Sequence, residues 1–472
     1  MIRKKSKIPL EKGGLDKMIN NLNEIVTQNV GQMECIIKEF AKEAVELEQQ
    51  KKLTINSIER IAAKAIRELI QVILSMAGLL LSNIANDKTE MYCECGKKMV
   101  LAKRNAQTRI LSVFGYIPVI RDTVFCRRCH KGYGVLDKEI EIHGEHRVTK
   151  AMVETIAYIA QLVPSFERAS EAIKKLLKID ISPTQIQIIS EKVGKEVFER
   201  DMAEAEAIHE KPEESVPQEL PRYRKEGRLY IITDGSQVNT RIEDQDGSTW
   251  KEMKLGLIFC DKDVIKRGNE SHSIVKKEYV SYFGSVKEFK KLLFAAAARA
   301  GYGKIKEVVV IGDGAQWIWN MCEELFPDAV QILDFYHLSE NTHNYAKLIY
   351  PEDEISRKRW VNQVLDAVKN GKVDEAIKII EQNKIDKIPN TVVNLYTYII
   401  NNRERIDYKT YKEKGYYIGS GAIESANKMV IQQRMKQSGM RWSINGGQYI
   451  ASLRSKHESN LWKEVIETIN AS

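Results

Sequence analysis

The sequence is poor in cysteine and proline. Its seven cysteines are an odd number among 472 residues, and an odd count argues against a complete disulfide framework. Only ten prolines are present. The N-terminus begins with basic residues, but no apolar core follows them, so we expect no secretory signal.

The sequence also lacks a long, purely apolar run. The longest stretch without charge lies between Glu68 and Asp87, and Gln71, Ser75 and Ser82 interrupt it. Because a membrane span requires about 20 predominantly apolar residues, a buried helix is the favoured interpretation. We therefore expect a soluble, cytoplasmic protein with no membrane partner.

No extreme of charge is present. The formal net charge is +8, with 43% hydrophobic and 29% charged residues, which is ordinary for a globular protein. The modest basic excess suits a polyanionic partner without requiring one. The length predicts two to four domains.

Four of the cysteines lie close together, as Cys93-x-Cys95 and Cys126-x-x-Cys129, on either side of a predicted hairpin. Four thiolates suit one tetrahedral Zn²⁺ ion, and a closed four-ligand site is structural rather than catalytic. His130 is expected to lie beside the ligands rather than among them. Free or redox-active thiols are the alternative.

The first half of the chain reads as helices around this module. The apolar spacing predicts helices over about 15–85, two strands within 109–125 that are joined at Gly115 and Pro118, and helices again over 149–201. Within the last segment, Ser182 suits an N-cap and Pro183 a first helical turn. Helix, turn and helix form the outline of a DNA-reading motif, although a plain helical hairpin looks the same.

A proline-rich polar stretch at 209–226 predicts a linker, and an α/β pattern follows it. Three strands, a helix, a strand, a helix and a strand form the element order of a ribonuclease-H-like fold. In that fold the first and fourth strands are central, parallel neighbours. Asp234 and Asp313 end these two strands, so both carboxylates are expected at the same sheet edge, where open α/β sheets bind ligands.

Two ionised carboxylates at such close range repel one another, and a bound cation or a proton relieves the repulsion. Mg²⁺ is the usual occupant, and two such ions suit phosphodiester chemistry. Glu424, at the start of a helix, is the candidate for a third acid, while Asp334 is a rival for the second because it also ends a strand.

A basic run with an aromatic residue follows Glu424. Such residues suit DNA phosphates and base stacking, although a solvated charged face is the alternative. The candidate nucleic-acid contacts are Lys428, Arg434, Lys436, Arg441 and Trp442.

The motifs around these acids resemble those of Mutator-like bacterial insertion-sequence transposases, especially the ISKra-type family. The motifs that carry this resemblance begin at Asp234, Gly312, Phe326, Ile332 and Gly419. The resemblance implies that Asp234, Asp313 and Glu424 bind metal ions, and that an all-helical insertion separates the last two acids. It also marks Asp334 and His337, which either support the site or join the fifth strand to the next helix.

The expected architecture is therefore an α/β catalytic domain, with a ribonuclease-H-like mixed sheet and a helical insertion, joined to an N-terminal helical region and a small zinc ribbon. The predicted segments are 1–90 (helical), 91–147 (zinc ribbon), 148–208 (possible helix-turn-helix), 209–226 (linker), 227–337 with 416–456 (catalytic), and 338–415 (insertion).

The expected function is that of a DNA transposase of the Asp-Asp-Glu type, which cleaves element ends and joins them to target DNA. It would use two Mg²⁺ or Mn²⁺ ions and double-stranded DNA, and it would act as a homo-oligomer because two ends must be brought together. The alternatives are a structure-selective nuclease on the same fold and a zinc-containing DNA-binding regulator without catalysis.

Overall fold

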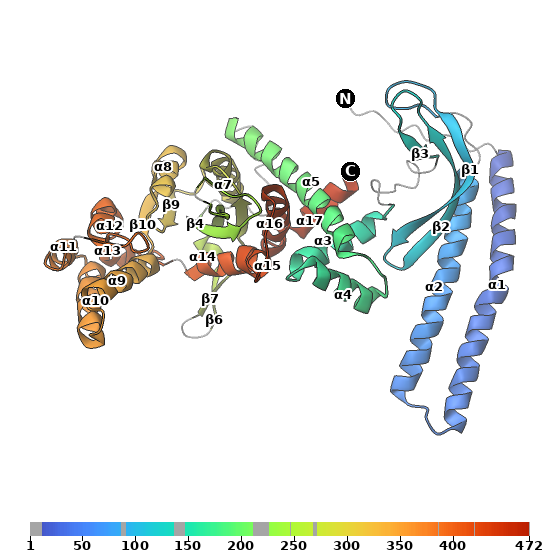
Figure 1. Cartoon of the computed structure of the whole chain (residues 1–472), viewed down its shortest axis with the longest axis horizontal. Helices are drawn as coiled ribbons and strands as arrows, with labels where there is room; N and C mark the ends of the chain where they lie inside the picture. Colours follow the sequence, from blue (N-terminus) through green and yellow to red (C-terminus); the bar gives the residue numbers. More distant parts are fainter. Residues whose placement is uncertain are drawn as a thin grey trace. The chain divides into compact units, whose positions relative to one another are not determined.

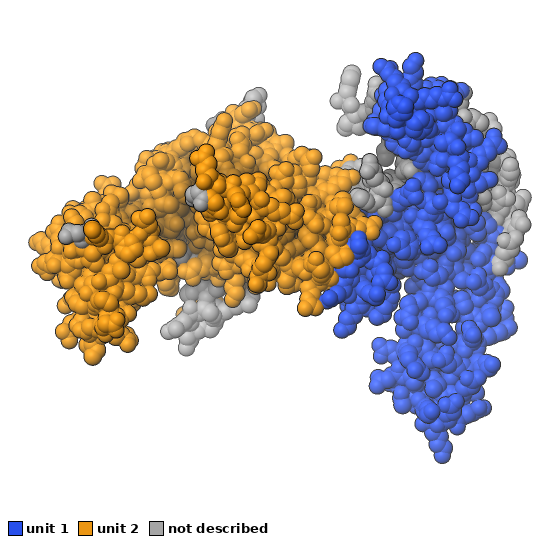
Figure 2. Space-filling model, in the orientation of Figure 1, with its two compact units in different colours: residues 1–156, 170–182, 472 blue, residues 157–169, 183–471 orange. Residues whose placement is uncertain are grey.

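The chain forms two compact units in the computed structural model (Figure 2). The first contains residues 1–156, 170–182 and 472, and the second contains 157–169 and 183–471. The structure describes residues 12–85, 91–135, 147–210, 226–245, 247–267, 271–385, 387–419 and 421–471.

The first unit combines a long helical hairpin with a small sheet (Figure 1). Its helices are α1 (Lys12–Gln49) and α2 (Ile55–Ala85), and its strands are β1 (Val100–Ser112), β2 (Gly115–Phe125) and β3 (Gly132–Gly134). The strands form an antiparallel sheet in the order β1-β2-β3.

Strand β2 packs closely against α2. A Cβ atom added to Gly78 would lie 1.8 Å from the carbonyl oxygen of Pro118, so this approach requires glycine. The backbone N–H of Ile120 also donates to Ser82 Oγ at 2.9 Å. The predicted strand pair is thus confirmed, but Pro118 lies inside β2, opposite Arg109, rather than at the turn.

The apolar stretch before residue 87 is helical, as expected, but it is not the buried helix that the sequence suggested. Within Ile55–Ser82, α2 is long and apolar enough to cross a membrane, and only 17% of its most apolar window is buried. Val72 is buried, whereas Ile66 and Ile73 are exposed. One such helix is weak evidence for a membrane span, because core helices of soluble proteins have the same composition.

Three helices follow the sheet: α3 (Lys150–Leu162), α4 (Phe166–Leu177) and α5 (Pro183–Glu210). Helix α5 begins at Pro183, as predicted, and the order helix, turn, helix is present. It continues through residues 209 and 210, where the linker was expected to begin. Residues 211–225 of that predicted linker lie outside the described residues.

The second unit is built around a mixed five-stranded sheet with the order β10-β9-β4-β5-β8. The strands are β4 (Arg228–Asn239), β5 (Trp250–Cys260), β8 (Glu278–Tyr282), β9 (Glu307–Gly312) and β10 (Val330–Leu333). Strand β4 pairs with β5 in antiparallel and with β9 in parallel orientation. The prediction that the first and fourth strands are parallel neighbours is therefore confirmed.

Two features of this sheet differ from expectation. Strand β4 continues to Asn239, so Asp234 lies within the strand instead of ending it. The sequence between the second and third predicted strands also forms a separate hairpin of β6 (Val264–Arg267) and β7 (Ser271–Ile274), preceded by the 3₁₀ turn η1 (Asp261–Asp263). Polar residues interrupt the apolar alternation there, which explains why the pattern did not predict these strands.

Helices pack on both faces of the sheet. Apolar residues of α5, α7 (Val286–Ala300) and α8 (Gln316–Leu325) form one buried core with alternate residues of β4 such as Leu229 and Ile231. Toward the C-terminus, α16 (Ile444–Glu458) packs along β8, where Tyr279 N–H donates to Ser459 Oγ at 2.8 Å, just beyond the end of the helix.

The long connection between β10 and the predicted third acid is helical, as expected. Its helices are α9 (Phe335–Ile349), α10 (Glu354–Lys369), α11 (Val373–Glu381), α12 (Leu395–Asn401), the short η2 (Arg403–Arg405) and α13 (Tyr408–Glu413). The chain then forms α14 (Gly421–Ala426), the π-helical segment η3 (Asn427–Gln432), α15 (Gln433–Met435), α16 and α17 (Trp462–Ala471). The helix predicted after Gly419 is thus α14, and it is not the last.

Candidate functional site

Two aspartates lie side by side where the central parallel strands diverge. Thr233 of β4 pairs with Gly312 of β9, so Asp234 and Asp313 are the next residues on the two strands. Asp234 accepts a hydrogen bond from the backbone N–H of Gly235, at 2.7 Å, and Asp313 accepts one from Ala315 at 2.8 Å. A backbone N–H group close to each aspartate thus holds its carboxylate in place.

The environment of this pair disfavours negative charge. Burial, followed by the charge of Asp313, raises the pKa of Asp234 to about 6. Burial also raises the pKa of Asp313, and the carboxylates of Glu252 and Asp334 add to that increase. Such perturbation by desolvation and like charge is typical of functional carboxylates, although structural networks also produce it.

A cavity of about 400 Å³ opens beside Asp234. Glu424 and Lys428, from α14 and η3, line it together with His337 of α9. The structure thus brings two of the three predicted acids to one cavity, with the predicted histidine. The carboxylates of Asp234, Asp313 and Glu424 do not all lie within 4.8 Å of one another. Among the described residues, only the four cysteines form a group that is this close.

Two buried polar atoms near this cavity make no hydrogen bond in the described part of the chain: Asn427 Oδ1 and His337 Nε2. The other polar atom of the Asn427 amide, Nδ2, donates a hydrogen bond to Asp234 Oδ2. His337 Nε2 lies 3.6 Å from Asp334 Oδ2. Carboxylate and carboxamide oxygens are what Mg²⁺ prefers, and imidazole nitrogen suits softer divalent ions. The donor set therefore fits a divalent metal ion.

Asp334 caps the helix that carries His337. Its side chain accepts from the backbone N–H groups of Tyr336, at 3.0 Å, and His337, at 3.4 Å, and it is only 1% exposed. The sequence left two roles open for Asp334 and His337: support of the site, or a junction between the fifth strand and the next helix. The cap matches the second role. Both carboxylate oxygens of Asp334 accept a backbone hydrogen bond of this cap.

The helical insertion also supports the site. The hydroxyl of Tyr398, on α12, donates to the backbone carbonyl of Asp313 at 2.6 Å. A Cβ atom on Gly314, whose φ is +99°, would lie 2.6 Å from the Tyr398 ring. Residues far apart in the sequence therefore fix the backbone beside the second aspartate.

Glu252 is an acidic neighbour that the sequence analysis missed. Its carboxylate lies against Gly235, where a Cβ atom would come within 2.2 Å of it, and it accepts from Lys254 at 2.7 Å. Only the pairing of β5 with β4 brings it to the site. A lone glutamate in a strand-forming stretch carries no local signal of this role.

The predicted nucleic-acid contacts divide into two groups. Lys428, Lys436 and Arg441 are exposed. Arg434 and Trp442 are only 1% and 5% exposed. The guanidinium of Arg434 donates to the backbone carbonyls at positions 160 and 164 and lies 5.0 Å from the Trp442 ring centroid, so these two side chains stabilise the interior and are not exposed for contact with DNA.

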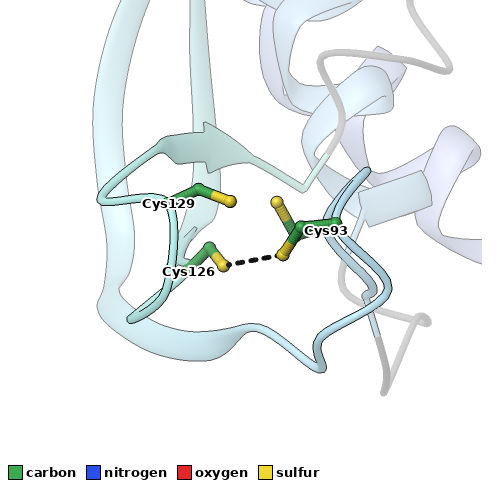
Figure 3. Close-up of side chains that lie close together, drawn as sticks. Cys93, Cys126 and Cys129 are labelled. Carbon is green, nitrogen blue, oxygen red and sulfur yellow. Dashed lines mark hydrogen bonds between the residues drawn. The ribbon is translucent and has the colours of Figure 1, made fainter.

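The first unit holds a separate candidate metal centre. The four sulfur atoms of Cys93, Cys95, Cys126 and Cys129 lie within 4.8 Å of one another, and Figure 3 shows the labelled thiols pointing to a common centre. Cys95 Sγ and Cys126 Sγ are 3.7 Å apart, which matches the roughly 3.8 Å edge of a tetrahedron with Zn–S bonds of about 2.3 Å. His130 is not part of the group.

One thiol of this centre is already biased toward the thiolate. A hydrogen bond from the backbone N–H of Lys97, followed by one from Cys129, lowers the pKa of Cys95 to about 7. Thiolate is the form that binds metal, so these four residues could hold a metal ion such as zinc.

A family model spans nearly the whole chain. Residues 44–467 match the Uncharacterised protein family (UPF0236). The chain belongs to this family. No curated protein matches the sequence. The UPF0236 match includes the four cysteines, Asp234, Asp313 and Glu424, so both candidate centres lie within the family's shared region.

A buried arginine, Arg454, holds the η3 segment, which begins at Asn427. In the π-helical turns of η3, backbone N–H groups bond to carbonyl groups five residues earlier instead of four. Arg454 of α16, which is 2% exposed, donates to two carbonyl groups of η3, Val430 O at 3.0 Å and Met429 O, and also to Gln161 O. Such π-helical irregularities occur frequently at functional sites.

Replacing Arg454 by methionine is therefore expected to lower the free energy of unfolding by about 2–4 kcal/mol, because several buried carbonyls lose their donor. Urea denaturation measures this change. Arg441→Met, at an exposed position, is the matched control and should change stability by less than about 0.5 kcal/mol. Equal stability of the two variants would show that Arg454 does not support η3.

Proposed function

We propose that this protein is a DNA transposase of the Asp-Asp-Glu type, with a catalytic domain of ribonuclease-H-like fold. The observation that carries the proposal is the pair Asp234 and Asp313, adjacent on parallel central strands and with pKa values raised by burial. Paired carboxylates of this kind can hold the ions of two-metal phosphodiester chemistry. The strand order and the helical insertion also support this fold.

The residues that would hold two Mg²⁺ or Mn²⁺ ions are Asp234, Asp313 and Glu424. When bound, such ions activate an attacking oxygen and stabilise the leaving oxygen in phosphodiester exchange. Asn427 keeps the carboxylate of Asp234 in place through its amide. Glu424 must approach the two aspartates to share their ions, and its side chain is exposed on the six-residue helix α14.

The surroundings suit a DNA partner. Lys428 lines the cavity with the acids, and Lys436 and Arg441 are exposed on the segment that follows. These cations would attract the phosphates of element ends and target DNA. We further propose that zinc stabilises the cysteine module, that the protein acts in the cytoplasm, and that a homo-oligomer brings two ends together.

The proposal is tested with purified protein, Mg²⁺ or Mn²⁺, and DNA that carries the flanks of the gene, beside an Asp313→Ala control. We expect nicking near the flanks and joining of the freed strands by the native protein. The control should still bind DNA but should lose at least about 10³-fold in cleavage rate, since the metal contributes several kcal/mol to the transition state.

The same experiment separates two other functions. Cleavage without joining would indicate a structure-selective nuclease that uses the same residues. DNA binding without metal-dependent cleavage would indicate a zinc-containing regulator. Cleavage that persists in Asp313→Ala would remove Asp313 from the active site.

A further inference from the structure

A second, larger cavity lies on the other side of helix α14 from the acidic site. Its volume is about 680 Å³, within the range of about 300–1,000 Å³ that is typical of ligand sites. Ser425 lines both this cavity and the acidic one. Because only helix α14 lies between the two cavities, a ligand that spans both has to pass only this short helix.

The walls of this cavity are aromatic. Phe335, Tyr336 and Tyr417 line it, together with the buried rings of Phe259 and Tyr279. Tyr336 is 56% exposed although it is a large aromatic residue. Its ring packs on the backbone of Gly419, where a Cβ atom would come within 2.5 Å of it, so the chain fixes one side of the ring and the other remains accessible.

The charged residues that the described part of the chain contributes to the lining are all lysines. Lys277, Lys369 and Lys412 border the cavity, and no aspartate or glutamate is among the described lining residues. Within the described residues, none of these lysines forms a close ion pair with a carboxylate, and the charge of Glu458 acts on Lys277 from a greater distance. Lys277 and Lys369 instead lie over aromatic rings, with their Nζ atoms 5.4 Å and 5.0 Å from the centroids of Tyr279 and Phe335.

We infer that this cavity receives an unpaired nucleotide of the DNA strand that is processed at the acidic site. Aromatic faces stack on bases with little sequence preference, and lysines balance backbone phosphate. Inside a double helix neighbouring bases cover both faces of each base, so a base that enters the cavity must be unstacked or single-stranded. This inference rests on the proposed function. It adds that the protein prefers DNA with an unpaired nucleotide next to the scissile phosphate.

The test measures DNA binding without cleavage. Fluorescein-labelled duplexes with a blunt end, a three-nucleotide 3′ overhang or a three-nucleotide 5′ overhang are titrated with the full chain in EDTA, and binding is followed by fluorescence anisotropy. We expect one overhang to bind about tenfold more tightly than the blunt duplex, the size of effect that stacking of a single base produces.

Three variants of lining residues and one control variant on α17 test whether the preference comes from the cavity. Tyr336→Ala should bind blunt and overhang DNA equally, whereas Tyr336→Phe, which keeps the ring, should retain the preference. Lys277→Gln should weaken overhang binding and reduce its dependence on salt by about one phosphate contact, while Lys463→Gln, at a site that is 88% exposed on α17, should not.

The failures of the two proposals are distinguishable. Equal binding of blunt and overhang DNA by the native protein would overturn the nucleotide cavity and leave DNA binding intact. A preference that survives Tyr336→Ala would place the unpaired nucleotide elsewhere. Failure to bind any of the three DNAs would overturn both the nucleotide cavity and the proposed function.

Discussion

Replacing Asp234 by asparagine is expected to stabilise the protein and to abolish strand cleavage at the same time. The pKa of Asp234 is raised from an ordinary value of 3.8 to about 6, first by burial and then by the charge of Asp313. The folded protein therefore holds this proton more tightly than the unfolded chain does. Ionisation in the folded state costs on the order of 3 kcal/mol, because one pKa unit corresponds to about 1.4 kcal/mol.

The pH dependence follows from the direction of this shift. The stabilising contribution of the protonated carboxyl is fully present below pH 3.8, and it is lost as the pH rises to about 6. Asparagine carries no charge, and its amide oxygen can still accept from Asn427. The advantage of Asp234→Asn should therefore be small near pH 4 and should approach about 3 kcal/mol above pH 6.

Urea denaturation in EDTA at several pH values measures this difference, with Asp366→Asn as the control because Asp366 is exposed on α10. Mg²⁺ should then stabilise the native protein but not Asp234→Asn, since a ligand stabilises only the state that binds it. If Asp234→Asn were less stable than the native protein at neutral pH, the result would contradict the raised pKa of Asp234. A stable variant that has lost cleavage would exclude misfolding as the reason for the loss.

The sequence predicted the sheet well because its central strands are locally distinctive. The run Val308–Ile311 is apolar and β-branched and is followed by Gly312, a pattern that indicates a buried parallel strand. Once β4 and β9 are recognised as neighbours, the pairing of Asp234 with Asp313 follows from register. The four cysteines were equally predictable, because their spacing is a local property of the chain.

The parts that were not predictable depend on tertiary packing. Glu252 reaches the acidic pair only because β5 pairs with β4, and no short-range pattern reports that contact. Arg434 and Trp442 belong to a basic, aromatic stretch that suggests a surface, yet buried backbone carbonyls attract the guanidinium into the interior. Composition cannot distinguish an arginine that binds phosphate from one that binds the protein's own carbonyl groups.

Replacing Cys126 by serine is expected to remove the zinc proposed for the first unit and to unfold the part of its small sheet that surrounds the four cysteines. Cys126 is fully buried, and the apolar cluster around it consists of only a few side chains, among them Met99, Val124 and Val135. So small a core contributes little stability by itself. In comparable zinc modules, metal binding supplies on the order of 10 kcal/mol, which is also the free energy of folding.

The native protein should therefore contain one zinc per chain by elemental analysis, and Cys126→Ser should contain almost none. Hydrogen exchange should show loss of protection in residues 91–101 and 123–135 of the variant, with the sheet around β4 unchanged, because the two regions belong to separate units. Cys35→Ser is the matched control, since that thiol is exposed and lies outside the cluster. If Cys126→Ser kept its zinc, or if the native protein bound none under reducing conditions, the four thiols would have a role other than a structural metal site.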